Sequence, residues 1–158
     1  MVSIEDLKKL FLFKNLSDKD LEQILQITRL HEFKEEEVVF KEGYKADTFY
    51  MLKRGKVLLE VDISELIGIS LGAVKTGFSF GWSALMPDSV YTSSAICSET
   101  CEIFSVPGND FLNLLNNDHT IGYYIMEGVS RIIRGRLKRR TDQFLMVMSK
   151  HPDIQKLL

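Results

Sequence analysis

A series of short strand-like segments between residues 33 and 106 constrains the fold of this chain more than any other feature. The segments are rich in β-branched and aromatic residues and fall at 38–40, 48–52, 56–61, 91–97 and 102–106, with 63–74 as strand or loop. Glycine turns such as Glu42-Gly43 and Thr76-Gly77 separate several of them. Short strands at regular spacing with glycine turns predict an all-β roll, barrel or sandwich.

Helical patterns stand on both sides of this β region. Residues 3–30 are expected to form short helices, with Ser3 and Ser17 as N-caps ahead of acidic residues. Asn109 or Asp110 is expected to cap a further helix after the strands. The predicted organisation is N-terminal helices over 1–30, a β-roll over 31–107 and C-terminal helices over 108–158, as one domain. The predicted fold class is therefore mainly β with flanking helices.

The last helix is expected to be long. Asp118 is a candidate N-cap, and no proline interrupts residues 119–148. Ile121, Ile125, Gly128, Ile132 and Gly135 recur on one stripe, where the small residues permit close helix approach. A second apolar row follows Met126, Val129, Ile133, Leu137, Phe144 and Met148. One row suits the roll and the other a partner helix, so a homodimer through this helix is predicted.

Composition narrows the class of protein. The chain has 158 residues, of which 45% are hydrophobic and 27% charged, enough for one packed domain. It has no membrane-length apolar run and no signal-peptide pattern, so a protein that does not enter a membrane is expected. With two cysteines and no disulfide framework, the expected location is the reducing cytoplasm. Cys97 and Cys101 are the only cysteines, and their spacing is not a usual metal motif, so free thiols are expected. No metal site, catalytic residue or enzymatic activity is predicted.

The stretch from Phe80 to Ser94 is the candidate ligand site. It starts with Phe80-Gly81-Trp82-Ser83-Ala84 and ends in the hydroxyl-rich run Tyr91-Thr92-Ser93-Ser94. Small residues on a tight turn leave backbone N–H groups free to point at a phosphate. The ligand class that fits such a turn is a small anion that carries phosphate, and no cofactor is assigned.

The chain resembles the cyclic nucleotide-binding domain family, which includes catabolite activator-type regulators and protein kinase A regulatory subunits. The resemblance makes a cyclic nucleotide one candidate ligand beside other small anions. The resemblance spans about residues 12–137. It is carried by Leu12 to Ser17, by Glu42-Gly43, Ala46-Asp47, Tyr50, Leu52, Gly55 and Val57, by Gly77 to Gly81 with Ala84-Leu85, and by Val106-Pro107 with Phe111. It implies a double-stranded β-helix, or jelly-roll-like β-roll, with a phosphate-binding cassette near Gly81 and a long C-terminal dimerisation helix.

The cassette departs from the family pattern at two positions. The resemblance implies a Glu for the ribose 2′-hydroxyl after Phe-Gly, where this chain has Trp82. It also implies an Arg for the cyclic phosphate, where an ungapped count reaches Tyr91. An Arg–phosphate pair is among the stronger polar contacts, and its loss should weaken affinity roughly a hundredfold or more. Ordinary cAMP or cGMP binding is therefore not expected.

Several readings of the remaining candidates stay open. The Trp82 ring either fills the vacated pocket or stacks on a planar ligand. Thr92 and Ser93 either donate hydroxyl groups to an anion or serve β-structure. Arg136 either supplies the missing positive charge to the pocket, as the resemblance suggests for residues near it, or belongs to a solvated helix face.

The charge of the chain is unevenly distributed. Residues 1–110 carry 12 basic and 18 acidic groups, whereas residues 111–158 carry 8 basic and 4 acidic groups. Six basic residues lie at 131–140, namely Arg131, Arg134, Arg136, Lys138, Arg139 and Arg140. No specific DNA binding is expected, because the family's regulators use a separate helix-turn-helix and too few residues follow this helix.

The predicted function is a non-enzymatic, ligand-sensing regulatory module that resembles a stand-alone cyclic nucleotide-binding domain. A small-molecule effector is the expected partner besides a second copy of the chain. The alternatives are a ligand-free dimerisation or interaction scaffold, and the sensor half of a transcription regulator that lacks its DNA-binding domain.

Overall fold

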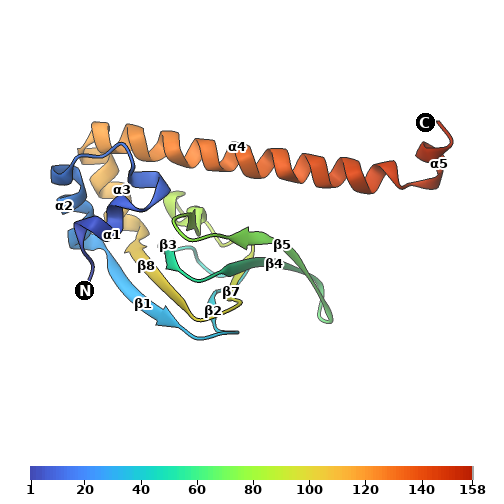
Figure 1. Cartoon of the computed structure of the whole chain (residues 1–158), viewed down its shortest axis with the longest axis horizontal. Coiled ribbons are helices and arrows are strands. Elements are labelled where there is room, and N and C mark those ends of the chain that lie inside the picture. The colour runs from blue at the N-terminus through green and yellow to red at the C-terminus, as the bar shows by residue number, and fades with distance from the viewer. Residues whose placement is uncertain (158) are drawn as a thin grey trace. The chain divides into compact units, whose positions relative to one another are not determined.

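The computed structural model describes residues 1–157, which divide into two compact units, residues 1–125 and residues 126–157. In the first unit, helices α1 (Ile4–Lys8), α2 (Asp18–Ile27) and α3 (Gly108–Asn117) gather at one end of the strands (Figure 1). A 3₁₀ turn, η1 (Phe11–Phe13), joins α1 to α2. Ser3 and Ser17 cap α1 and α2 through their side chains, as predicted, and Ser17 forms a capping box with Asp20.

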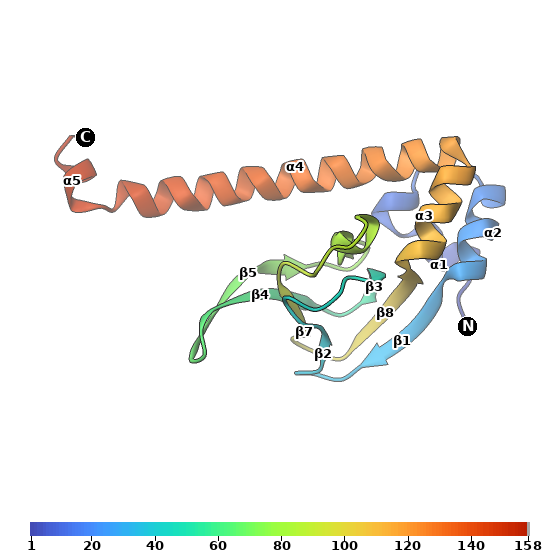
Figure 2. The same ribbon diagram turned by 180° about the vertical axis from the view of Figure 1, so that it is seen from behind.

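Two four-stranded antiparallel sheets form the roll. One sheet has the order β1-β8-β3-β6, from β1 (Arg29–Phe33), β8 (Cys101–Pro107), β3 (Thr48–Arg54) and β6 (Ser79–Phe80). The other has the order β2-β7-β4-β5, from β2 (Val38–Phe40), β7 (Ser94–Cys97), β4 (Val57–Ser64) and β5 (Ile67–Val74). The β4–β5 hairpin extends beyond the rest of the roll when seen from behind (Figure 2). The predicted class, a mainly β roll with flanking helices, is confirmed.

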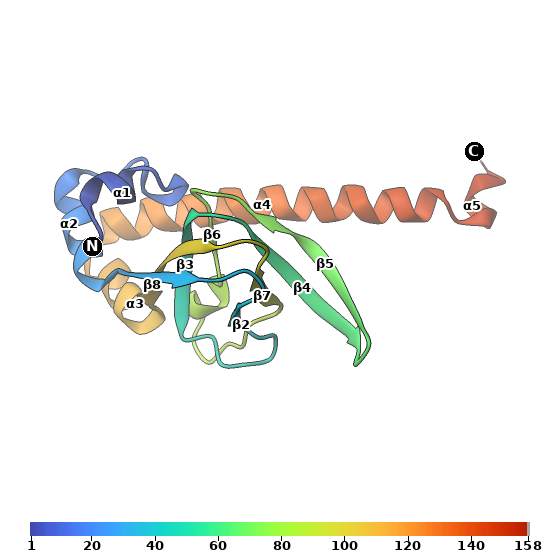
Figure 3. The same ribbon diagram turned by 60° about the horizontal axis from the view of Figure 1, so that its bottom comes forward.

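Large apolar side chains fill the space between the sheets and beneath the helices. The fully buried aromatic residues are Phe13, Phe49, Phe80, Phe104 and Phe111. The helices add Leu7, Leu21 and Ile24 from their apolar faces. Turned to bring its bottom forward, the ribbon shows the same three helices at one end of the strands (Figure 3). The roll is therefore closed at one end by packed helices, and this fixes the strands that carry the candidate site.

Three local predictions were wrong. The first helical region ends at Ile27, and residues 29–30 already belong to β1, because pairing with β8 outweighs the helical pattern. The strand predicted from residue 91 begins only at Ser94. The cap predicted at Asn109 or Asp110 is absent, because α3 starts at Gly108 behind Pro107 with no side-chain cap.

Gly108, the first residue of α3, lies very close to the backbone of Ala84. A Cβ at this position would lie 2.5 Å from the carbonyl oxygen of Ala84, so only glycine permits the close approach. This contact places the start of α3 against the 3₁₀ turn η2 (Trp82–Leu85), which belongs to the candidate ligand site.

The long helix α4 (His119–Ser149) continues from the first unit into the second, and a short helix α5 (Pro152–Gln155) follows it. Asp118 accepts the backbone N–H groups of Thr120 and Ile121 at 3.1 Å, so the predicted cap is confirmed. Within residues 1–157, not one helix has the length and hydrophobicity that a bilayer crossing requires.

Candidate ligand site

The cassette is a tight turn between β6 and η2. Gly81 has φ of 73°, in the left-handed region, and a Cβ there would lie 3.1 Å from the Tyr50 ring and 3.3 Å from the Thr48 carbonyl oxygen. Both the backbone conformation and the crowding therefore require glycine. Ala84 and Leu85 are buried under the turn, and Ser83 is half-buried. The predicted turn at Gly81 is present, and it is held from beneath by apolar packing.

Tyr91 is directed into the roll and bound to the protein's own backbone. Its side chain is buried, and its hydroxyl donates to the carbonyl oxygen of Thr48 at 2.7 Å. The same hydroxyl accepts the N–H of Thr48 at 3.2 Å. Both functions of the phenol are therefore satisfied by the main chain of β3. The position where the resemblance implies a phosphate-binding arginine holds a neutral group with its polar atom already paired.

Aromatic rings pack around Tyr91. Its ring lies parallel to that of Phe40, with centroids 3.8 Å apart and an interplanar angle of 15°. Phe40 also stacks on Tyr50 at 5.6 Å and on Phe80 at 5.9 Å. Tyr50 and Phe80 complete the cluster at 5.4 Å. We call these four residues the aromatic cluster; they come from β2, β3, β6 and the segment before β7.

The environment of the cluster is apolar. Burial raises the pKa of the Tyr91 phenol well above its usual value, and burial likewise raises that of Tyr50. A medium that disfavours a phenolate also disfavours a phosphate anion unless cations are placed beside it. None of the four rings carries a charge, so the cluster itself offers no counter-ion for a cyclic phosphate.

Trp82 begins η2 and is half-buried. Its indole N–H donates to the Ser79 hydroxyl at 3.0 Å, and Ser79 is itself buried. The one polar atom of the indole thus has a partner inside the cassette. This contact holds the indole nitrogen against the buried Ser79.

The remaining candidates are Thr92, Ser93 and Arg136. Thr92 is exposed and Ser93 is half-buried, and both precede β7. Arg136 lies on α4 in the second unit, and its pKa is lowered to about 10, first by burial and then by the nearby charges of Arg139 and Arg140. The structure brings Phe80, Gly81, Trp82, Ser83, Ala84 and Tyr91 together in the first unit; a role for Arg136 beside them stays a prediction.

Sequence reasoning did not identify two members of the site. The sequence identifies Phe40 only as the end of a strand, and Thr48 takes part through its backbone, which every residue type provides. The residue types give no clear signal for Phe40, because Val38, Val39 and Phe40 are all apolar and the strand is irregular between Val38 and Phe40.

The cassette and the segments around it carry hydroxyls, backbone groups and aromatic rings. Among residues 1–157, no group of three or more His, Cys, Asp and Glu side chains is placed to hold a metal ion.

A comparison with models of known protein families finds one that matches the chain. The family model of the cyclic nucleotide-binding domain matches residues 30–118, which is more than half of the chain. The chain therefore belongs to the cyclic nucleotide-binding domain family.

Solved structures share this fold. A candidate cyclic nucleotide-binding protein from Geobacter metallireducens GS-15 is 29% identical, with a TM-score of 0.76 over 87% of this chain and 99% of that chain. The sensor domain of the transcriptional regulator DNR from Pseudomonas aeruginosa is 21% identical, with a TM-score of 0.70 over 85% and 90%. The regulatory domain of Toxoplasma gondii PKA, solved with cAMP, is 18% identical, with a TM-score of 0.62 over 70% and 42%.

Proposed function

We propose that this chain is a non-enzymatic regulatory module whose β-roll does not use cAMP or cGMP as its ordinary effector. The observation that carries the proposal is Tyr91, whose hydroxyl both donates to and accepts from the Thr48 backbone while its ring stacks on Phe40. A nucleotide phosphate at this position would have to break those hydrogen bonds and would meet a neutral group in place of a guanidinium.

The regulatory signal in this proposal passes through α4. An effector that prefers one arrangement of the module shifts its population, and a partner that binds the long helix reads the shift. Large apolar side chains of residues 126–148 are exposed, among them Ile133, Leu137 and Phe144. Exposed apolar surface of this kind marks interaction sites, which supports a homodimer as the form in which α4 acts.

Two further parts of the proposal concern partners and place. The basic run 131–140 includes ion pairs within the helix, Arg131 with Glu127 and Lys138 with Asp142, which fit a solvated face. We propose only salt-sensitive, non-specific attraction to DNA from this run. The cytoplasmic location expected from the cysteine usage stays a prediction.

A ligand-free scaffold is the second candidate, and the aromatic cluster favours it. Rings that pack against one another leave a roll that is stable without a ligand, so dimerisation could be the whole function. Native mass spectrometry of freshly purified full-length protein separates the two candidates. A retained small molecule other than cAMP or cGMP supports the sensor, and a bare dimer supports the scaffold. Retained cAMP or cGMP would overturn both.

A further inference from the structure

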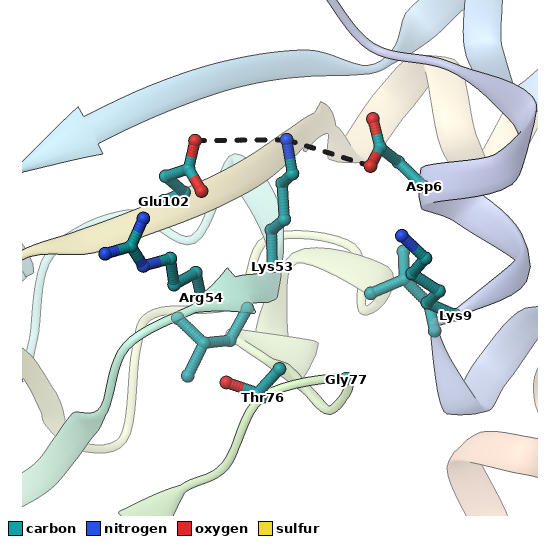
Figure 4. Close-up of a pocket in the computed structure, with 9 residues that line it drawn as sticks. Asp6, Lys9, Lys53, Arg54, Thr76, Gly77 and Glu102 are labelled. Carbon is teal, nitrogen blue, oxygen red and sulfur yellow. Dashed lines mark ion pairs between the residues drawn. The ribbon is translucent and has the colours of Figure 1, made fainter.

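A second hollow, distinct from the cassette, lies on the first unit between α1, the end of β3, the turn before β6 and the start of β8. Its volume is about 300 Å³, and its charged lining residues are Asp6, Lys9, Lys53, Arg54 and Glu102. Figure 4 shows Lys53 in the middle, with Arg54 and Lys9 on opposite sides of it. The buried side chains of Leu10 and Leu52 supply an apolar part of the lining. We call this hollow the cationic pocket.

The walls of the cationic pocket are fixed by backbone contacts. The N–H of Phe11 donates to the carbonyl oxygen of Gly77 at 2.8 Å, and the N–H of Gly77 donates to that of Leu52 at 2.8 Å. Gly77 has φ of +88°, and a Cβ there would lie 3.3 Å from the carbonyl oxygen of Lys9. The α1 side and the β3 side are thereby tied together through one glycine turn, so the pocket exists before any ligand arrives.

The cations of the pocket have unused hydrogen-bonding capacity. Lys53 Nζ lies 3.7 Å from Asp6 Oδ1 and 3.9 Å from Glu102 Oε1, which are ion-pair distances too long for hydrogen bonds. Asp6 instead accepts a hydrogen bond from the Ser3 hydroxyl at 3.0 Å. Over residues 1–157, the side chains of Lys9 and Arg54 make no hydrogen bond and no ion pair within 4 Å. Three cations thus face two carboxylates without a single hydrogen bond between the two sets.

We propose that the cationic pocket binds a small phosphate monoester. With both acids ionised, the five charged side chains sum to +1, and Arg54 and the two lysines offer the donors that phosphate oxygens accept. The Arg54 guanidinium can donate hydrogen bonds to two phosphate oxygens at once, while Lys9 and Lys53 act as point charges. The apolar lining from Leu10 and Leu52 receives the carbon part of the ester. This site would give the module an effector that does not depend on the aromatic cluster.

The test is a titration of the ¹⁵N-labelled full chain at constant ionic strength, followed by two-dimensional NMR. The probes are glycerol 3-phosphate, inorganic phosphate and glycerol. The proposal predicts saturable shifts at Lys9, Lys53, Arg54 and Gly77 with both phosphate probes and none with glycerol. Tighter binding of glycerol 3-phosphate than of inorganic phosphate shows that the apolar lining takes part, and equal binding assigns the site to free phosphate.

Charge-matched variants make the test specific. Lys9→Gln combined with Arg54→Gln should weaken glycerol 3-phosphate binding about tenfold or more, and neither residue holds an ion pair whose loss would unfold the chain. Lys34→Gln combined with Lys41→Gln removes the same charge from exposed sites elsewhere and should leave binding unchanged. Equal weakening by both pairs, or no shifts up to about 10 mM of either phosphate probe, overturns the proposal.

Discussion

At the scale of single residues, Tyr91 decides what the roll can hold. Its hydroxyl satisfies both the N–H and the C=O of Thr48, so removing that hydroxyl leaves two backbone groups without this partner. We expect Tyr91→Phe to lower the free energy of unfolding by about 1–3 kcal/mol. Urea denaturation measures the change. Tyr44→Phe is the matched control, because Tyr44 is 65% exposed and should change stability little. Equal stability of Tyr91→Phe and wild type would contradict this reading.

Alkaline pH should weaken the fold for a related reason. Burial raises the pKa of Tyr91 in the folded state, while the unfolded chain releases the proton near about pH 10. The folded state then binds more protons, so the free energy of unfolding holds steady below about pH 10 and falls as pH rises toward the folded pKa. Tyr50 shifts in the same direction, so Tyr91→Phe should reduce the fall without abolishing it. Urea midpoints between about pH 8 and 11 test this, and a midpoint that rises with pH would refute it.

The two cysteines should be unreactive in the folded chain. Cys97 and Cys101 are both buried, and burial followed by the neighbouring Cys101 raises the pKa of the Cys97 thiol to about 12. Because the thiolate is the nucleophile, iodoacetamide at about pH 8 should alkylate neither residue quickly until urea unfolds the chain. Mass spectrometry follows the labelling. Rapid double labelling of native protein would show that the β7–β8 corner opens readily.

Part of this site could be predicted from the residue types alone. The turn at Gly81 was predicted, because glycine tolerates φ above zero. The family spacing placed Tyr91 at the candidate ligand site, and its ligand-binding role stays a prediction. The two hydrogen bonds between the Tyr91 hydroxyl and the Thr48 backbone were not predictable, because every residue type provides the same backbone groups. The same holds for the stacking on Phe40, since Phe40 and Tyr91 meet only after two sheets have formed.

At the scale of elements, α4 carries the prediction of a dimer. An added Cβ at Gly135 would meet nothing within 4 Å, whereas Gly128 is already buried. Gly135→Leu is therefore the cleaner probe, because it adds bulk to the predicted seam without crowding the single chain. We expect it to weaken the dimer, measured by analytical ultracentrifugation at tens of micromolar protein. Lys138→Leu adds apolar bulk on the charged face of the helix, outside both apolar rows, and should have little effect. A monomeric wild type would refute the dimer.

Element boundaries were predicted well where local chemistry sets them and poorly where tertiary contacts do. Ser3, Ser17 and Asp118 cap helices through their own side chains, so the sequence marks those starts. β1 begins at Arg29 because β8 pairs with it, and the start of α3 needs a glycine because the carbonyl oxygen of Ala84 lies against Gly108. β8 is far from β1 in the sequence, and Ala84 is far from Gly108, so no local sequence pattern predicts those boundaries.

At the scale of the whole molecule, membership of the family does not determine which ligand the chain binds. The chain belongs to the cyclic nucleotide-binding domain family, and its strands, cassette turn and helices follow that fold. At the position where the family resemblance implies an arginine for the phosphate, this chain has Tyr91, buried among its ring partners. Fold alone does not imply function, so the ligand must be argued from the site.

Isothermal titration of cAMP into the wild-type protein, beside Trp82→Glu combined with Tyr91→Arg, tests most directly whether the absence of that arginine weakens cAMP binding. We predict a wild-type dissociation constant in the high micromolar range, on the order of 10⁻⁴ M or weaker, because no guanidinium meets the phosphate. The paired variant restores the family's Glu and Arg and should bind more tightly, provided that its circular dichroism and urea midpoint show an intact fold. Submicromolar binding of cAMP by the wild type would contradict the account.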